Sequence, residues 1–155
     1  MIQVEIPGRE TLTIEHVALD YNGTIAFDGA LLPGVAEQMQ ALSRLVHVYV
    51  LTADTYGTVK KQCAGLGAEI KTFPRAQAAL CKEEIVRELG EHVACVGNGF
   101  NDIQMFDLAE LAIGVMDGEG ICAKLLPHAD VLTRSGKEAL DLLLHTDRLK
   151  ATLRT

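Results

Sequence analysis

The ten residues VALDYNGTIA, Val17 to Ala26, decide how this chain folds. An apolar, β-like run ends at a single acid, Asp20, and the turn-forming residues Asn22, Gly23 and Thr24 follow at once. In parallel sheets, ligands bind beyond the carboxyl ends of the strands. The stretch therefore predicts a core strand that delivers one carboxylate to a binding edge.

Short apolar runs alternate with helical patterns along the rest of the chain. After a predicted N-terminal β-hairpin of residues 2–6 and 11–20, strands are predicted at 46–51, 68–73, 92–97, 111–115 and 129–133. Helices are predicted at 33–45, 55–64, 78–89, 101–110, 120–126 and 135–144, the last with Ser135 as its N-cap. This alternation predicts an α/β fold, a three-layer, Rossmann-like parallel sheet with helices on both faces.

Length and composition limit the class of protein. The chain has 155 residues, so we expect a single domain over residues 1–155. A net charge of −7 without a basic cluster argues against a nucleic-acid partner. No apolar run approaches the ~18 residues of a membrane span, and no signal-peptide pattern begins the sequence. The four cysteines lack metal-site spacing, so we expect reduced thiols in a cytoplasmic protein.

Polar residues follow three of the predicted strands. Asp20, Thr52 and Asn98 each come directly after an apolar run, so they should meet at one edge of the sheet. We expect the backbone N–H groups of Gly23 and Thr24, and the helix start after Thr52, to favour an anion. The oxygens of Asn98 and nearby Asp102 suit a hard cation such as Mg²⁺. Together these groups favour phosphoryl transfer through an aspartyl-phosphate.

Four stretches make the prediction more specific. They are, in order, LDYNGT (19–24), VLTAD (50–54), CKEEIVREL (81–89) and GNGFND (97–102). In order and spacing they resemble the four motifs of the haloacid dehalogenase superfamily of phosphotransferases. More narrowly, the sequence resembles soluble relatives of the P-type ATPase phosphorylation domain. The resemblance covers about residues 14–145.

This resemblance implies a role for each matching residue. The implied catalytic residues are Asp20 as nucleophile, Asn22 and Lys82. The implied phosphate-binding residues are Gly23, Thr24, Thr52, Ala53, Lys82 and Asn101. The implied Mg²⁺ ligands are Asp20, the backbone carbonyl of Asn22, Asn98 and Asp102.

Two asparagines depart from the family pattern. Phosphatases of the superfamily usually carry a second aspartate, which works as general acid and base, where this chain has Asn22. An amide cannot do that work, and losing a general acid/base typically costs ~10²–10⁴-fold in rate. Asn98 also removes one negative charge from the implied metal site. We therefore expect a slow Mg²⁺-dependent phosphatase; the alternative is a regulatory module that binds phosphate and Mg²⁺ without hydrolysis.

Other classes of protein fit the residues less well. A response-regulator receiver domain would need an acidic pair at the end of an early strand, and none is present. GNGFND resembles a dinucleotide-binding loop, but such a loop opens the first βα unit, and no motif of this kind is found there.

The sequence leaves no room for a cap domain over the site. Residues 25–51 and 53–81, where such insertions occur in the superfamily, are used by the predicted elements. An open site would accept a bulky small-molecule phosphomonoester or a phosphorylated partner, or a second copy of the chain would cover it. The N-terminal hairpin is the one additional segment that could shape its rim or pair between chains.

Overall fold

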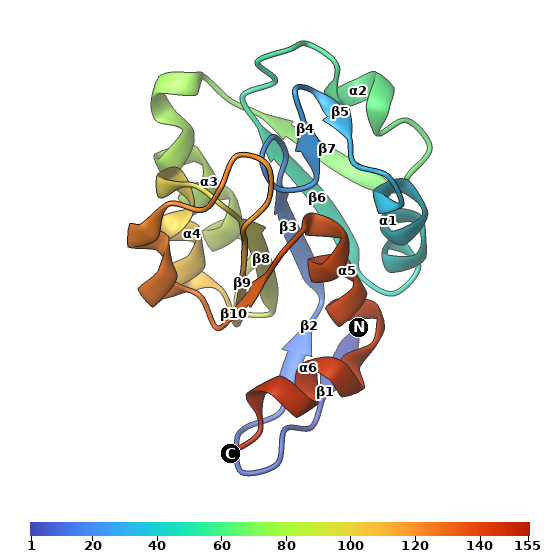
Figure 1. Ribbon diagram of the computed structural model, residues 1–155, viewed down its shortest axis with the longest axis vertical. Helices are drawn as coiled ribbons and strands as arrows, with labels where there is room; N and C mark the ends of the chain where they lie inside the picture. Colours follow the sequence, from blue (N-terminus) through green and yellow to red (C-terminus); the bar gives the residue numbers. More distant parts are fainter.

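Six parallel strands form the central sheet of the computed structural model, which describes all 155 residues (Figure 1). The strands are β3 (His16–Asp20), β6 (His47–Thr52), β7 (Ala68–Thr72), β8 (Val93–Gly97), β9 (Leu111–Val115) and β10 (Val131–Thr133). Their order is β10-β9-β8-β3-β6-β7. The strand that ends at Asp20 thus lies between β6 and β8, where the chain switches from one side of the sheet to the other. Such a switch point opens a crevice at the carboxyl ends of the strands.

Helices cover both faces of this sheet, which confirms the predicted three-layer α/β class. On one face α1 (Val35–Ser43) packs beside α5 (Gly136–Leu144), and on the other α3 (Ala78–Leu89) packs beside α4 (Ile103–Leu108). Each face has its own hydrophobic cluster, centred on such residues as Met39 and Leu140 on the first face and Val86 and Met105 on the second. The predicted N-cap of α5 is present, because Ser135 Oγ accepts a hydrogen bond from the Glu138 N–H.

Two predicted helices differ from the observed ones. The helix expected at 55–64 is only α2 (Val59–Gln62), because Asp54 and Gly57 adopt left-handed φ values of 47° and 66°. The helix expected at 120–126 is the 3₁₀ segment η3 (Ala123–His128), which contains Pro127. Two further 3₁₀ segments, η1 (Arg75–Gln77) and η2 (Phe100–Asp102), precede α3 and α4.

The predicted N-terminal hairpin forms, but it does not lie at the site. Strands β1 (Ile2–Val4) and β2 (Leu12–Ile14) pair antiparallel, and a bend at Glu15 separates β2 from β3. Because β2 leads directly into the start of β3, the hairpin lies beyond the end of the sheet opposite to Asp20 (Figure 1). The expectation that this hairpin shapes the rim of the site is therefore wrong. A final helix that the sequence patterns did not predict, α6 (Thr146–Leu153), packs against β1.

A second, smaller hairpin follows Asp20 and was also missed. Strands β4 (Ala26–Phe27) and β5 (Ala30–Leu31) are joined by Asp28 and Gly29, with φ values of 50° and 84°. Two positive φ angles are the mark of a type I′ turn, for which Asp-Gly is a preferred sequence. This hairpin and α1 are the only elements between β3 and β6, so no cap domain is inserted there.

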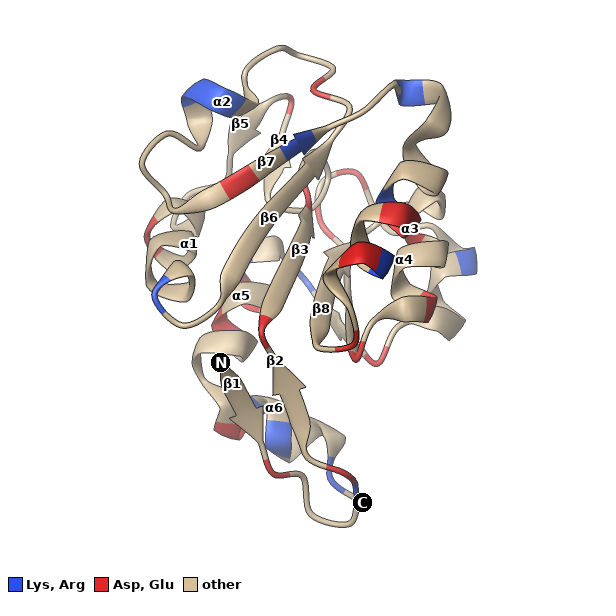
Figure 2. Ribbon diagram, turned by 180° about the vertical axis from the view of Figure 1, so that it is seen from behind, with Lys and Arg blue, Asp and Glu red and all other residues tan.

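The basic residues are scattered over the face of the molecule that Figure 2 shows. Lysine and arginine lie apart on α2, β7, α3 and α6, and Figure 2 shows no continuous basic stripe on the face it presents. None of the helices is both long and apolar enough to cross a membrane.

The contact of α6 with β1 provides a test of the fold. Leu149 of α6 is fully buried in the larger cluster, so we expect Leu149→Ala to lower the free energy of unfolding by about 2–5 kcal/mol. The matched control is Leu80→Ala, because Leu80 on α3 is 53% exposed and should cost less than about 0.5 kcal/mol. Urea denaturation measures both. Equal midpoints for the two variants would contradict the packing of α6 described here.

Candidate active site

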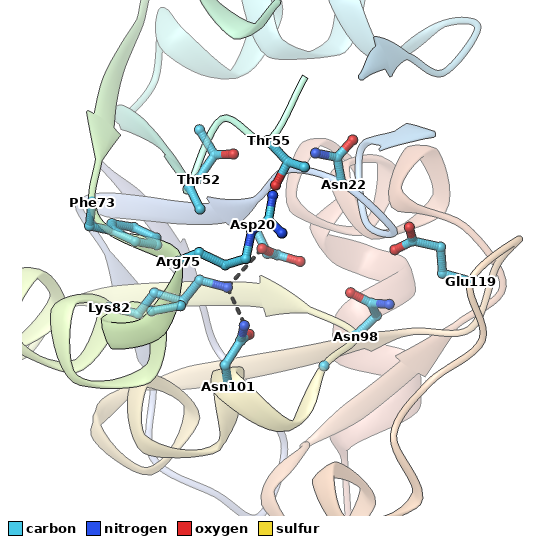
Figure 3. A pocket seen from close by; sticks show the side chains of 13 residues that line it. Asp20, Asn22, Thr52, Thr55, Phe73, Arg75, Lys82, Asn98, Asn101 and Glu119 are labelled. Atoms are coloured by element: carbon cyan, nitrogen blue, oxygen red, sulfur yellow. Dashed lines mark hydrogen bonds and ion pairs between the residues drawn. The ribbon is translucent and has the colours of Figure 1, made fainter. Parts of the chain in front are cut away.

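The carboxyl ends of the strands enclose a cleft of about 270 Å³. Asp20 enters it from the end of β3, Thr52 from the end of β6, and Asn98 from the residue after β8 (Figure 3). The structure thus brings together the three strand-end residues singled out in the sequence. The other residues that line the cleft are Asn22, Ala53, Thr55, Phe73, Arg75, Ala78, Lys82, Gly99, Asn101 and Glu119.

Lys82 is the cation at the base of this cleft. It lies in the first half of α3, and its Nζ donates to Asp20 Oδ1 and Asp102 Oδ1, both at 2.7 Å, and to Asn101 Oδ1 at 3.0 Å. The residue is only 2% exposed. Desolvation lowers the pKa of Lys82, but the negative charges of Asp20 and Asp102 outweigh it and raise the pKa above its ordinary value. A fully charged ammonium group is therefore held against the candidate nucleophile.

Asp102 lies behind Lys82 rather than in the cleft. Its side chain is completely buried, and Oδ2 accepts the backbone N–H groups of Asn98 at 3.1 Å and Gly99 at 2.9 Å. Burial and the charge of Asp20 raise the pKa of Asp102 above its ordinary value, while Lys82 and the Gly99 N–H act in the opposite direction. In this structure Asp102 orients Lys82 and fixes the loop after β8, and its part in binding a metal stays a prediction.

The hydroxyl of Thr24 positions Asp20. The backbone N–H groups of the same turn differ from the prediction. The Thr24 hydroxyl lies 3.0 Å from Asp20 Oδ2 and 3.2 Å from Asn98 Oδ1. Its backbone N–H donates to the Tyr21 carbonyl, and the Gly23 N–H donates to the Ala26 carbonyl. Both N–H groups predicted to hold an anion are thus used within the turn.

Asn22 lines the cleft, but its side chain also has a structural partner. Asn22 Oδ1 accepts the backbone N–H of Gly29 at 2.9 Å, at the tip of the β4–β5 hairpin. The Gly29 carbonyl in turn accepts the hydroxyls of Tyr21 at 2.9 Å and Thr58 at 2.7 Å. The amide therefore fixes a hairpin beside the cleft, and no titratable group occupies this position.

The phosphate-binding residues predicted after β6 do face the cleft. Thr52 and Ala53 line it, and Thr52 Oγ1 accepts the backbone N–H of Asp54 at 2.9 Å. Because the hydroxyl accepts that bond, its own hydrogen is free to donate into the cleft. Asp54 Oδ1 accepts the Val59 N–H at 3.2 Å, so Asp54 fixes the loop that leads into α2.

Glu119 is a cleft residue that the sequence patterns did not identify. It lies in the loop after β9, and its carboxylate points into the cleft from the side opposite to Lys82 (Figure 3). Partial burial and the charges of Asp20 and Asp28 raise its pKa above the ordinary value. The sequence did contain a signal for Glu119. The residue lies in the loop that follows β9, and β9 is another parallel strand whose carboxyl end lies at the same edge of the sheet.

The oxygen groups of the cleft fit the Mg²⁺ that the family motifs imply. Asp20 Oδ2 and Asn98 Oδ1 converge on the same Thr24 hydroxyl. At Gly23, which has a φ of 82°, a Cβ atom would lie 2.0 Å from Glu119 Oε2 and 3.0 Å from Asn98 Oδ1, so only glycine leaves this space open. Hard oxygen donors around an open space are what Mg²⁺ requires. No three His, Cys, Asp or Glu side chains are grouped for a metal, so amide or backbone oxygens would have to contribute.

Removal of Lys82 should reveal how much the charge cluster depends on it. Lys82→Met would leave two carboxylates, one fully buried, without their cation, so we expect a loss of about 3–5 kcal/mol in unfolding free energy. Lys71→Met is the control, because Lys71 pairs with Glu69 at the surface and should cost at most about 1 kcal/mol. Denaturant titrations compare the two variants. A Lys82→Met protein as stable as the control would show that the buried ion pairs of Lys82 do not stabilise the fold.

Comparisons with known proteins agree with this architecture. An uncharacterised protein of Methanocaldococcus jannaschii is 36% identical over 80 residues, which cover 48% of this chain and 86% of that protein. A soluble P-type ATPase-like phosphatase of the same organism is 26% identical over 144 residues, which cover 90% of this chain and 53% of that protein. The chain thus spans about half the length of that relative.

The fold is shared with a solved phosphatase. The structure of 3-deoxy-D-manno-octulosonate 8-phosphate phosphatase from Moraxella catarrhalis, in complex with magnesium, phosphate and KDO, superposes with a TM-score of 0.71 at 20% identity. The superposition covers 91% of this chain and 94% of that one. The sequence model of the haloacid dehalogenase-like hydrolase family matches residues 2–109, which is more than half of the chain. The resemblance predicted from the four motifs is thus confirmed, and the chain belongs to the haloacid dehalogenase-like hydrolase family.

Proposed function

We propose that this protein is a Mg²⁺-dependent phosphatase that hydrolyses phosphomonoesters through an aspartyl-phosphate on Asp20, and that its turnover is slow. The observation that carries the proposal is the 2.7 Å ion pair between Lys82 and Asp20 in an open cleft at the strand ends. The named phosphatases among the relatives and structural neighbours support the same reaction class. The open cleft suits a small phosphomonoester or a phosphorylated partner.

The first step transfers the phosphoryl group to Asp20. A carboxylate oxygen of Asp20 attacks phosphorus, the bond to the ester oxygen breaks, and the alcohol leaves with a proton taken from water. Lys82 holds the phosphoryl oxygens by charge, while the Thr52 hydroxyl donates a neutral hydrogen bond. Mg²⁺, held by Asp20, Asn98 and the Asn22 carbonyl, would neutralise phosphoryl charge.

The second step returns the phosphoryl group to water. Water attacks phosphorus, the acyl phosphate bond breaks, and the Asp20 carboxylate is regenerated with release of phosphate. This water needs a base, and the amide of Asn22 cannot accept its proton. Both steps are therefore slowed, and the second becomes limiting whenever the leaving group is good.

A non-hydrolysing regulatory module is the second candidate function. The observation in its favour is the Asn22 side chain, which binds the Gly29 N–H of the β4–β5 hairpin and offers no acid or base to the cleft. Such a module would bind phosphate and Mg²⁺ without releasing an alcohol.

The first experiment tests whether Asp20 is the nucleophile. With an aryl phosphate and Mg²⁺ we expect slow steady-state hydrolysis, which Asp20→Asn or chelation of the metal by EDTA should abolish. Glu37→Gln is a control for the loss of one negative charge, because Glu37 is exposed on α1 and should leave the rate unchanged. Activity that persists in Asp20→Asn would exclude this mechanism.

The second experiment separates the slow enzyme from the inert module. In the wild type we expect a burst of aryl alcohol, about stoichiometric with enzyme, before slow turnover in quench-flow. Asn22→Asp keeps an oxygen acceptor for the Gly29 N–H and adds a titratable group, so it should raise the turnover rate, by up to ~10²–10⁴-fold, and remove the burst. Asn22→Ala, which removes the acceptor and adds no acid, should not raise the rate. Absence of a burst together with an unchanged rate in Asn22→Asp would favour the regulatory module.

A further inference from the structure

Glu119 presents a carboxylate to the cleft without a partner of its own. Its side chain makes no hydrogen bond and no ion pair in the structure, although three hydrogen bonds hold Lys82 on the opposite side. Figure 3 shows the Glu119 carboxylate pointing between Asn22 and Asn98. Glu119 is exposed, so water solvates its charge, but the like charges of Glu119 and Asp20 repel each other, and a cation between them would relieve that repulsion.

The loop that carries Glu119 is held in place by Asn98. The Gly120 N–H donates to the Asp117 carbonyl at 2.7 Å, which closes a turn with Glu119 near its tip. Asn98 Nδ2 donates to the Gly120 carbonyl at 3.1 Å, and the Asn98 carbonyl accepts the Cys122 N–H at 2.8 Å. An ionised aspartate at position 98 could not donate to the Gly120 carbonyl, because a carboxylate only accepts.

The two side chains also converge in space. The position that a Gly23 Cβ would occupy lies 2.0 Å from Glu119 Oε2, 2.6 Å from Asn98 Nδ2 and 3.0 Å from Asn98 Oδ1, so the sum of the first and last distances is an upper limit on the separation of the two oxygens. Oxygen ligands of one octahedral Mg²⁺ lie about 3–4 Å apart, which falls within that limit. Glu119 and Asn98 are therefore placed to share one cation.

The charge of the cleft leads to the same conclusion. Arg75 also lines the cleft, so Asp20, Asp102, Lys82 and Arg75 together carry no net charge, whereas a carboxylate at position 98, as in the family motif, would add one negative charge. Glu119 supplies that negative charge from a different loop.

We propose that Glu119 supplies the carboxylate which Asn98 lacks at the cation site, and that the Asn98 amide positions the Glu119 loop for this purpose. The inference rests on the proposed Mg²⁺-dependent function. In this assignment Glu119 is a ligand of the cation. Asn98 contributes an oxygen ligand to the cation and also positions the Glu119 loop.

Isothermal titration of the substrate-free protein with MgCl₂ tests this assignment independently of catalysis. We expect Glu119→Gln to weaken Mg²⁺ binding by about 10–100-fold, and Glu37→Gln to leave it unchanged. Asn98→Asp introduced into the Glu119→Gln protein should recover most of the affinity, because the carboxylate then stands at the family position. Circular dichroism confirms that the variants remain folded.

The outcomes separate this inference from the proposed function. Wild-type affinity in Glu119→Gln, or no recovery in the double variant, would overturn the role of Glu119 while leaving a Mg²⁺-dependent phosphatase intact. A wild-type protein that hydrolyses an aryl phosphate without binding Mg²⁺ would overturn both the metal dependence and this inference.

Discussion

The buried contact between Lys82 and two carboxylates constrains the rest of the structure. Lys82 comes from α3, Asp20 from β3 and Asp102 from the loop after β8, so the contact joins three segments that are distant in sequence. Burying an ammonium group costs several kcal/mol unless it is well paired, and here two carboxylates and an amide oxygen surround it. The helix and the loop must therefore pack at this edge of the sheet in one arrangement. The same contact holds one oxygen of Asp20 and orients the carboxylate toward the cleft.

Two asparagines give the site its particular character. Each stands where phosphatases of the superfamily usually carry an acid, and each uses its amide to fix a loop beside the cleft: Asn22 Oδ1 accepts from Gly29, and Asn98 Nδ2 donates to Gly120. An acid at position 22 could keep its bond, whereas an ionised acid at position 98 could not. Asn22 thus removes acid–base chemistry without a structural need for the amide. Asn98, in contrast, exchanges a charge for a hydrogen bond that positions Glu119.

Most of the fold could be predicted from the sequence, because apolar runs ending in Asp20, Thr52 and Asn98 have the pattern of buried parallel strands. The missed β4–β5 hairpin had a signal in Asp28-Gly29, but its strands have two residues each, too short for any periodicity. The location of the N-terminal hairpin could not be predicted, since it depends on the bend at Glu15.

The candidate site could be predicted only in part, because several of its contacts depend on tertiary structure. The resemblance to the four family motifs placed Lys82 and Asn101 with Asp20, because their positions match the third and fourth motifs. It could not show that the Gly23 and Thr24 N–H groups close their own turn, or that Glu119 enters from the loop after β9. Those facts depend on tertiary contacts that no local pattern records.

The central claim is that Asp20 carries the phosphoryl group during turnover. Acid quenching of the enzyme in the steady state with an aryl phosphate and Mg²⁺, followed by peptide mass spectrometry, measures this directly. The account predicts one phosphoryl group on the peptide that contains Asp20, removed by hydroxylamine as an acyl phosphate should be. A protein that turns over substrate with no adduct there, or with the phosphoryl group on another residue, would contradict the account.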